Sequence, residues 1–168
     1  MICFVGESHA PTIMRAAAHQ KGLPITNDVA KADLVFVSED TPTDANGNRY
    51  MQPIRDLVEF ARRATKAPIV LTSQSPPGFS RSLGMPERLF HQAETLRIKD
   101  AIDRALNPEM IVIGFSSQPY EVPKAYQEYL IVFSCPCLLM SYEEAEFSKI
   151  AINMMLAAQV DATNKLAT

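Results

Sequence analysis

The stretch ADLVFVSEDTPTD, residues 32–44, decides the fold because a run of apolar residues breaks off into a polar loop. The run over residues 32–39 is rich in Leu, Val and Phe, which predicts a strand buried on both faces. Similar runs predict further strands at residues 2–6, 68–74, 110–115 and 135–141. Helical patterns lie at residues 11–22, 51–66, 94–106 and 123–133. This alternation predicts an α/β fold in which helices cover both faces of a parallel sheet.

The composition is that of one globular domain with a real core. The chain has 168 residues, of which 47% are hydrophobic and 21% are charged. Its formal charge of −3 and the lack of a Lys/Arg block argue against a nucleic-acid surface. No apolar run reaches the length of a transmembrane helix, and the N-terminus does not resemble a signal peptide. We therefore expect no membrane and no nucleic-acid partner.

The cysteines are few and odd in number, which favours a reducing cytoplasm. They are Cys3, Cys135 and Cys137, and no histidine lies near the CPC pair in sequence. We expect buried strand cysteines here and no metal site.

The segment EEAEFSKIAINMM, residues 143–155, places an amine and an amide in an apolar helical run. Lys149 and Asn153 are four residues apart and so share one face of a helix. Apolar residues cover the rest of the cylinder, which predicts burial on more than one side. A buried lysine needs a partner. Two interpretations stay open: an ion pair between Glu146 and Lys149, or a polar face turned toward an anionic ligand.

This last helix is expected to be long. Its pattern runs from Tyr142 to the end of the sequence with no Gly, Pro or other obvious C-cap. Roughly 26 residues would span about 40 Å at 1.5 Å per residue. We expect the helix to continue into a further part of the protein or to pack on a partner.

Ligands of parallel α/β sheets bind at the carboxyl ends of strands. The most polar strand ends are SEDTPTD, residues 38–44, and TSQSPPG, residues 72–78. A site is therefore expected at these two loops. A cation site in the acidic first loop is a weaker possibility, because acidic loops at strand ends are usually solvated.

The order of several stretches resembles the UDP-glucose/GDP-mannose dehydrogenase family. These stretches are ADLVFVSEDTPTD, LTSQSPPGFSRSL, FHQAETL with RALNPEMIVIG, and CPCLLMSYEEAEFSKIAINMMLA. They cover about residues 26–168. The resemblance implies a Rossmann-like sheet, abbreviated at the N-terminus, and a long central helix that supports dimerisation. It also implies NAD-dependent oxidation of the primary alcohol of a UDP- or GDP-sugar to the carboxylate, in polysaccharide biosynthesis.

The resemblance assigns four catalytic residues. Lys149 and Asn153 match the family motif E-L-x-K-x-x-x-N, in which the ammonium stabilises a developing oxyanion and the amide holds it. Glu94 matches a glutamate that acts as general base in thioester hydrolysis. An acidic residue at the start of a helix over residues 94–106 would also be favoured by the helix macrodipole. Gln74 stands where most members have a catalytic threonine, and its amide can still position a water.

The resemblance assigns cofactor contacts to Gly6, Ser8, Thr41, Pro42 and Ser73. The turn GESHAP, residues 6–11, keeps Gly6 but has Ser8 and Pro11 where G-x-G-x-x-G has glycines. The second strand, which carries the ribose-binding acid, is missing. We therefore expect NAD to bind weakly or not at all.

The family's thiol nucleophile belongs to a further C-terminal domain, so Cys135 and Cys137 do not match it. We interpret residues 1–141 as the NAD-binding-type domain and residues 142–168 as the start of the central dimerisation helix. The main hypothesis is an incomplete NAD-dependent nucleotide-sugar dehydrogenase with little turnover in isolation. The alternative is a non-catalytic relative that binds a nucleotide sugar or a partner chain. The expected partners are a nucleotide sugar such as UDP-glucose, and either a second copy or a missing C-terminal domain.

Overall fold

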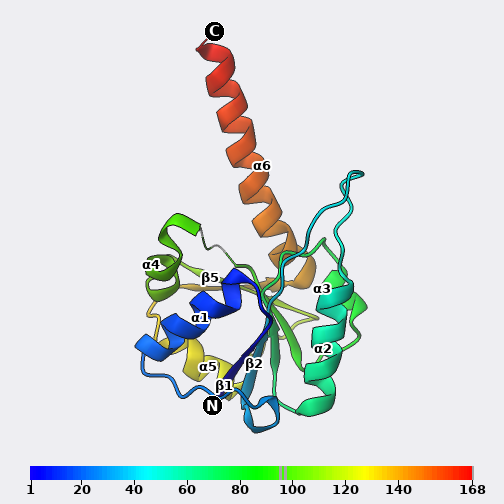
Figure 1. The fold of residues 1–168 in the computed structure, drawn as a ribbon, viewed down its shortest axis with the longest axis vertical. Coiled ribbons are helices and arrows are strands. Elements are labelled where there is room, and N and C mark those ends of the chain that lie inside the picture. Colours follow the sequence, from blue (N-terminus) through cyan, green and yellow to red (C-terminus); the bar gives the residue numbers. More distant parts are fainter. Residues whose placement is uncertain (95, 97, 168) are drawn as a thin grey trace.

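The computed structural model describes residues 1–94, 96 and 98–167, and within these residues six strands form one sheet. The strands follow in chain order as β1 (Ile2–Val5), β2 (Leu34–Val37), β3 (Ile69–Leu71), β4 (Leu89–Gln92), β5 (Ile111–Phe115) and β6 (Cys137–Ser141). Neighbouring strands are parallel except β4 and β5, which are antiparallel. The predicted α/β fold is confirmed, with a mostly parallel sheet (Figure 1). The sequence analysis did not predict β4, whose four residues include a histidine and a glutamine.

Helices cover both faces of the sheet (Figure 1). They are α1 (His9–Gln20), α2 (Gln52–Ala64), α3 (Phe79–Ser82), α4 (Ala101–Leu106), α5 (Lys124–Ile131) and α6 (Tyr142–Leu166), with short 3₁₀-helices η1 (Val29–Lys31) and η2 (Ile98–Asp100). On one face, α1 and α5 bury Met14 and Tyr126 against strand residues such as Phe36. On the other face, α2 and α3 bury Ile54 and Phe79. Residues that alternate along each strand therefore enter different cores.

The connection from β1 to β2 retains one bridge where a second strand was expected to be missing. The N–H of Ile2 donates to the carbonyl of Pro24 at 2.8 Å, and the N–H of Thr26 donates to the carbonyl of Ile2 at 2.9 Å. Ile25 thereby forms a single parallel bridge on the outer edge of β1. The chain then crosses to the other face, where Val29 of η1 packs in the core beneath α2. The second strand is thus reduced to one bridge.

The helix expected over residues 94–106 begins later in the structure. Regular α-helix starts at Ala101, after η2, and Thr95 and Arg97 of the predicted range lie outside the described residues. Glu94 precedes both helical segments, and its carboxylate accepts the backbone N–H of Leu96. A helix macrodipole therefore does not explain Glu94, which holds its own local turn instead.

The first turn of α6 is anchored on the sheet. Ser141 caps the helix in a reciprocal capping box with Glu144. The Tyr142 hydroxyl donates to the backbone carbonyl of Leu89 in β4. Gly114 in β5 allows this approach, because a Cβ on that residue would lie 2.8 Å from the Cβ of Ala145.

Beyond Ala151, α6 leaves the sheet and rises away from the rest of the chain (Figure 1). The expectation that this helix is buried on more than one side is wrong there, because no other element covers it and its large apolar side chains are exposed. Within the described residues, no helix is long and apolar enough to span a membrane.

The cysteines differ in burial. Cys3 is buried within β1, whereas Cys135 is half-buried and Cys137 is exposed. The expectation of buried strand cysteines is wrong for Cys137, because β6 is an edge strand and its outer side is open.

Candidate functional site

The loops after β1, β2, β3 and β4 meet at one edge of the sheet, close to the start of α6. Glu146 of α6 fixes the loop after β3 in this place. Its carboxylate accepts the backbone N–H of Gly78 at 2.6 Å, the backbone N–H of Ser80 at 2.7 Å and the Ser75 hydroxyl at 3.2 Å. Glu146 is only 1% exposed. Three donors therefore compensate the burial of this charge.

Lys149 does not form the ion pair with Glu146 that was one interpretation of the sequence. Among the described residues, the Glu146 carboxylate bonds only to the loop after β3. Lys149 lies about one turn further along α6 and is half-buried. Its ammonium is instead close enough to the Glu94 carboxylate to lower the pKa of that group.

Glu94 and Lys149 come from segments far apart in the chain and form the core of the candidate site. Burial raises the pKa of the Glu94 carboxyl, and the charge of Lys149, the N–H of Leu96 and the charge of His9 lower it, in that order of size. A carboxylate with a raised pKa accepts a proton more readily, as a general base must. A half-buried ammonium beside it can stabilise an anionic oxygen.

The other two predicted catalytic residues make no contact with this pair. Asn153 lies one turn beyond Lys149 on the same side of α6 and is exposed. Gln74 follows β3 and is half-buried, and its backbone carbonyl accepts the Thr41 hydroxyl at 2.9 Å. In the part of the chain that the structure describes, no hydrogen bond joins either side chain to Glu94 or Lys149. Their catalytic roles stay predictions.

The hydroxyl groups of two predicted cofactor residues tie neighbouring loops together. The Ser73 hydroxyl accepts the backbone N–H of Glu39 at 2.7 Å and donates to the Glu39 carbonyl at 2.8 Å. The Thr41 hydroxyl donates to the loop after β3 and accepts the Arg49 guanidinium at 3.0 Å. Pro42, beside it, is exposed. The loops after β2 and β3 are therefore held as one unit.

The turn after β1 fits the pyrophosphate of a dinucleotide poorly. Gly6 has a φ of +120°, and a Cβ there would lie 1.7 Å from the carbonyl oxygen of Ser38. Its missing side chain thus allows β1 to pack on β2. The N–H of Glu7 donates to the Glu39 carboxylate at 2.9 Å. Pro11 in the first turn of α1 has no N–H to offer. With the ribose-binding strand reduced to one bridge, these residues do not form a regular dinucleotide seat.

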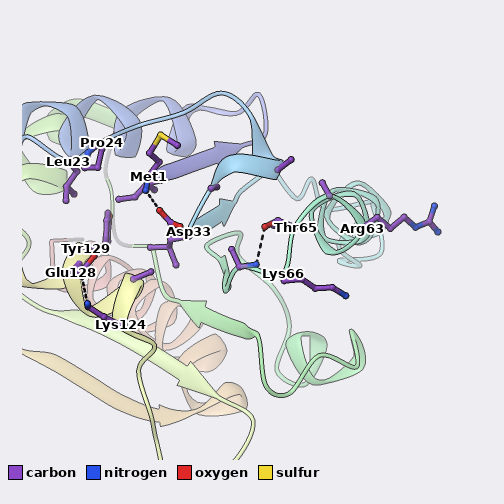
Figure 2. A pocket seen from close by; sticks show the side chains of 17 residues that line it. Met1, Leu23, Pro24, Asp33, Arg63, Thr65, Lys66, Lys124, Glu128 and Tyr129 are labelled. Carbon is purple, nitrogen blue, oxygen red and sulfur yellow. Dashed lines mark hydrogen bonds and ion pairs between the residues drawn. The ribbon is translucent and has the colours of Figure 1, made fainter.

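A broad hollow lies at the opposite edge of the sheet, around the amino ends of β1 and β2 (Figure 2). It measures about 820 Å³ and is lined by charges of both signs. The N-terminal ammonium pairs with Asp33, and Lys124 lies 3.8 Å from Glu128. None of the predicted site residues lines this hollow. Since parallel α/β sheets bind ligands at the carboxyl ends of their strands, we do not place the site here.

Sequence reasoning missed three residues of this edge. His9 was not considered, although it opens α1 directly beside the glycine turn. Glu39 was treated as part of a solvated acidic loop, yet its carboxylate bonds to the turn after β1. Ser80 bonds to Glu146 and lies 3.5 Å from His91. The only available clue was a carboxylate within an apolar helical run, because such a group must find donors somewhere.

Comparison with known proteins bears on this arrangement. No family model matches the chain. The UDP-glucose 6-dehydrogenase of Rickettsia typhi is 26% identical over 152 residues, which are 84% of this chain and 35% of that protein. This chain is similar to nucleotide-sugar dehydrogenases. The resemblance predicted from the sequence is thereby confirmed. The chain spans between 17% and 42% of the length of the curated relatives it matches.

Solved structures of nucleotide-sugar dehydrogenases share the fold. A UDP-glucose dehydrogenase of Pyrobaculum islandicum has a TM-score of 0.75 and 20% identity, covering 98% of this chain and 51% of its own. A GDP-mannose dehydrogenase of Pseudomonas aeruginosa has a TM-score of 0.69 and 23% identity, covering 95% of this chain and 41% of its own. These identities are low, so the likeness establishes the Rossmann-like fold alone.

Proposed function

We propose that this chain serves the oxidation of the primary alcohol of a UDP- or GDP-sugar to the carboxylate. Its own contribution is to bind the nucleotide sugar at Glu94 and Lys149. The observation that carries the proposal is the proximity of the Lys149 ammonium to the buried Glu94 carboxyl, at the strand ends where such sheets bind ligands. The similarity to UDP-glucose 6-dehydrogenases supports the choice of ligand.

In this proposal each residue has a distinct task. Lys149 supplies positive charge to the reacting oxygen of the sugar, and Asn153, one turn further along α6, donates a hydrogen bond to it. Glu94 accepts a proton from water, which its raised pKa favours. Gln74 orients that water. The family chemistry uses NAD as hydride acceptor, and the turn after β1 does not fit that group, so no step of ours passes through it.

A second chain or domain completes the site in this proposal. The exposed part of α6 supports pairing with a second copy or with a C-terminal domain that carries the thiol nucleophile. We expect little turnover from this chain alone. The alternative, a non-catalytic nucleotide-sugar-binding relative, is favoured by the contact of Glu39 with the phosphate turn. A cytoplasmic location, inferred from the few cysteines, also stays a prediction.

The test is the variant Lys149→Met, titrated with UDP-glucose and GDP-mannose by calorimetry. We expect binding to weaken by at least about tenfold, equivalent to about 1.4 kcal/mol. Thermal stability should be unchanged or slightly higher, since an incompletely paired and partly desolvated charge is removed. Lys165→Met, on the same helix but close to its end, is the matched control and should bind like the wild type. Equal affinity of both variants and the wild type would reject the proposed site.

A further inference from the structure

The carboxylate of Glu39 lies on the turn between β1 and α1. Its Oε2 accepts the backbone N–H of Glu7 at 2.9 Å, and its Oε1 accepts the backbone N–H of Asp40 at 3.0 Å. The backbone of Glu39 is fixed as well, because Ser73 bonds to both its N–H and its carbonyl. Glu39 therefore reaches the turn from a rigid position at the end of β2.

The amino end of α1 is built to receive an anion. The helix has 12 residues and no acidic residue in its first turn, and the side chain of its N-cap, Ser8, forms no capping bond. Free N–H groups and the macrodipole make such an end attract negative charge. Ser8 is only 8% exposed, and its hydroxyl has no hydrogen-bond partner among the described residues. The turn thus has spare hydrogen-bonding capacity, and Glu39 supplies its negative charge.

We propose that Glu39 is an internal anion that closes the phosphate turn of this sheet. A diphosphate group approaching α1 meets a fixed carboxylate at the N–H of Glu7 that it would need, and like charges repel. Removing the carboxylate would open the turn to a diphosphate. The inference concerns the β1–α1 turn only and does not depend on nucleotide-sugar binding at Lys149.

The test compares Glu39→Ala with Asp40→Ala by calorimetric titration with inorganic pyrophosphate and with NAD⁺. Asp40 is the matched control, because it is adjacent and exposed, and its carboxylate accepts no hydrogen bond from the described residues. Pyrophosphate needs the turn alone, whereas NAD⁺ also needs a seat for its adenosine ribose. We expect Glu39→Ala to bind pyrophosphate at least about tenfold more tightly than the wild type and to gain less for NAD⁺. Asp40→Ala should change either affinity by less than about twofold.

A second readout locates the binding. In Glu39→Ala, pyrophosphate should shift the backbone amide resonances of Glu7 and Ser8, and in the wild type it should leave them in place. Should Glu39→Ala fail to fold, Glu39→Gln replaces it and has to show a gain of the same sign. Equal gains in the Glu39 and Asp40 variants would mean a general charge effect and would overturn the proposal. Unchanged affinity in the Glu39 variants, or tight NAD⁺ binding by the wild type, would overturn it as well.

Discussion

The two ends of α6 differ more than any other two regions of the molecule. Its base is fixed by a capping box, by the Tyr142 hydroxyl on β4 and by the buried Glu146 carboxylate. Its outer part, from Ile152 onward, exposes Met154, Met155 and other large apolar side chains to solvent. One continuous helix therefore carries a polar, buried half and an apolar, exposed half.

This contrast teaches that residue polarity along α6 does not report burial. At the base, a charge is buried because the loop after β3 offers it three hydrogen-bond donors. In the outer part, apolar side chains are exposed because nothing in the described chain lies against them. Contiguous exposed apolar surface of this kind marks an interaction site. The candidate pair of Glu94 and Lys149 lies where the two halves join.

The largest effect is expected at Glu146. Replacing it by Ala removes three hydrogen bonds and leaves the N–H groups of Gly78 and Ser80 buried without an acceptor. Loss of one partner from a buried charged network costs about 3–5 kcal/mol. Urea unfolding of Glu146→Ala should show a loss of this size in the free energy of unfolding.

The matched control is Glu143→Ala, in the first turn of the same helix. Glu143 forms an ion pair with Arg81 at 2.6 Å, in which both side chains are partly exposed. Exposed pairs contribute about 0–1 kcal/mol. If Glu146→Ala were no more destabilising than Glu143→Ala, the base of α6 would not be held as the geometry indicates.

A smaller effect is expected from His91, which is buried beneath the base of α6. Burial lowers its pKa to about 4, against 6.5 for the free side chain. In this pH window the unfolded chain binds a proton that the folded chain does not, so stability falls as pH falls. His91 should remove about 2 kcal/mol of unfolding free energy between about pH 7 and about pH 5.

His91→Gln should flatten this part of the pH dependence, whatever its effect on stability at neutral pH. His19→Gln, at an exposed site on α1, should leave the slope unchanged. The raised pKa of Glu94 acts in the opposite direction, but it is common to all three proteins and cancels in the comparison. Parallel pH curves for the wild type and His91→Gln would contradict the prediction.

The smallest effect is expected in the outer part of α6. Met155→Ser changes a side chain that is 62% exposed, so the unfolding free energy of the monomer should shift by less than about 0.5 kcal/mol. Ile113→Ala, at a fully buried position, is the contrast and should cost about 2–5 kcal/mol.

The same Met155 variant sharpens the comparison in another way. If the outer part of α6 packs on a second copy, sedimentation of the wild type should show dimers at high micromolar concentration, and Met155→Ser should weaken them. A well-behaved wild-type monomer at that concentration would count against pairing through this helix.

The sequence by itself determined the α/β class, most of the strands and the length of α6. Apolar strands that alternate with amphipathic helices have few other ways to bury their surface. It also determined that the turn after β1 departs from the dinucleotide pattern, because glycine positions are read directly from the residues. The short strand β4 escaped because His91 and Gln92 interrupt its apolar run, and its burial comes from neighbours rather than from composition.

Only the tertiary structure decided which polar groups meet. Glu94 and Lys149, Glu146 and the loop after β3, and Glu39 and Glu7 are each more than 30 residues apart in sequence. Local patterns carry no record of such pairs, because a carboxylate looks the same whether it is solvated or holds a distant backbone amide. Burial of α6 was likewise undecided by sequence, since an apolar helix face is equally suited to a core and to another molecule. The physical reason is that hydrogen bonding and burial depend on what surrounds a residue after the sheet has formed.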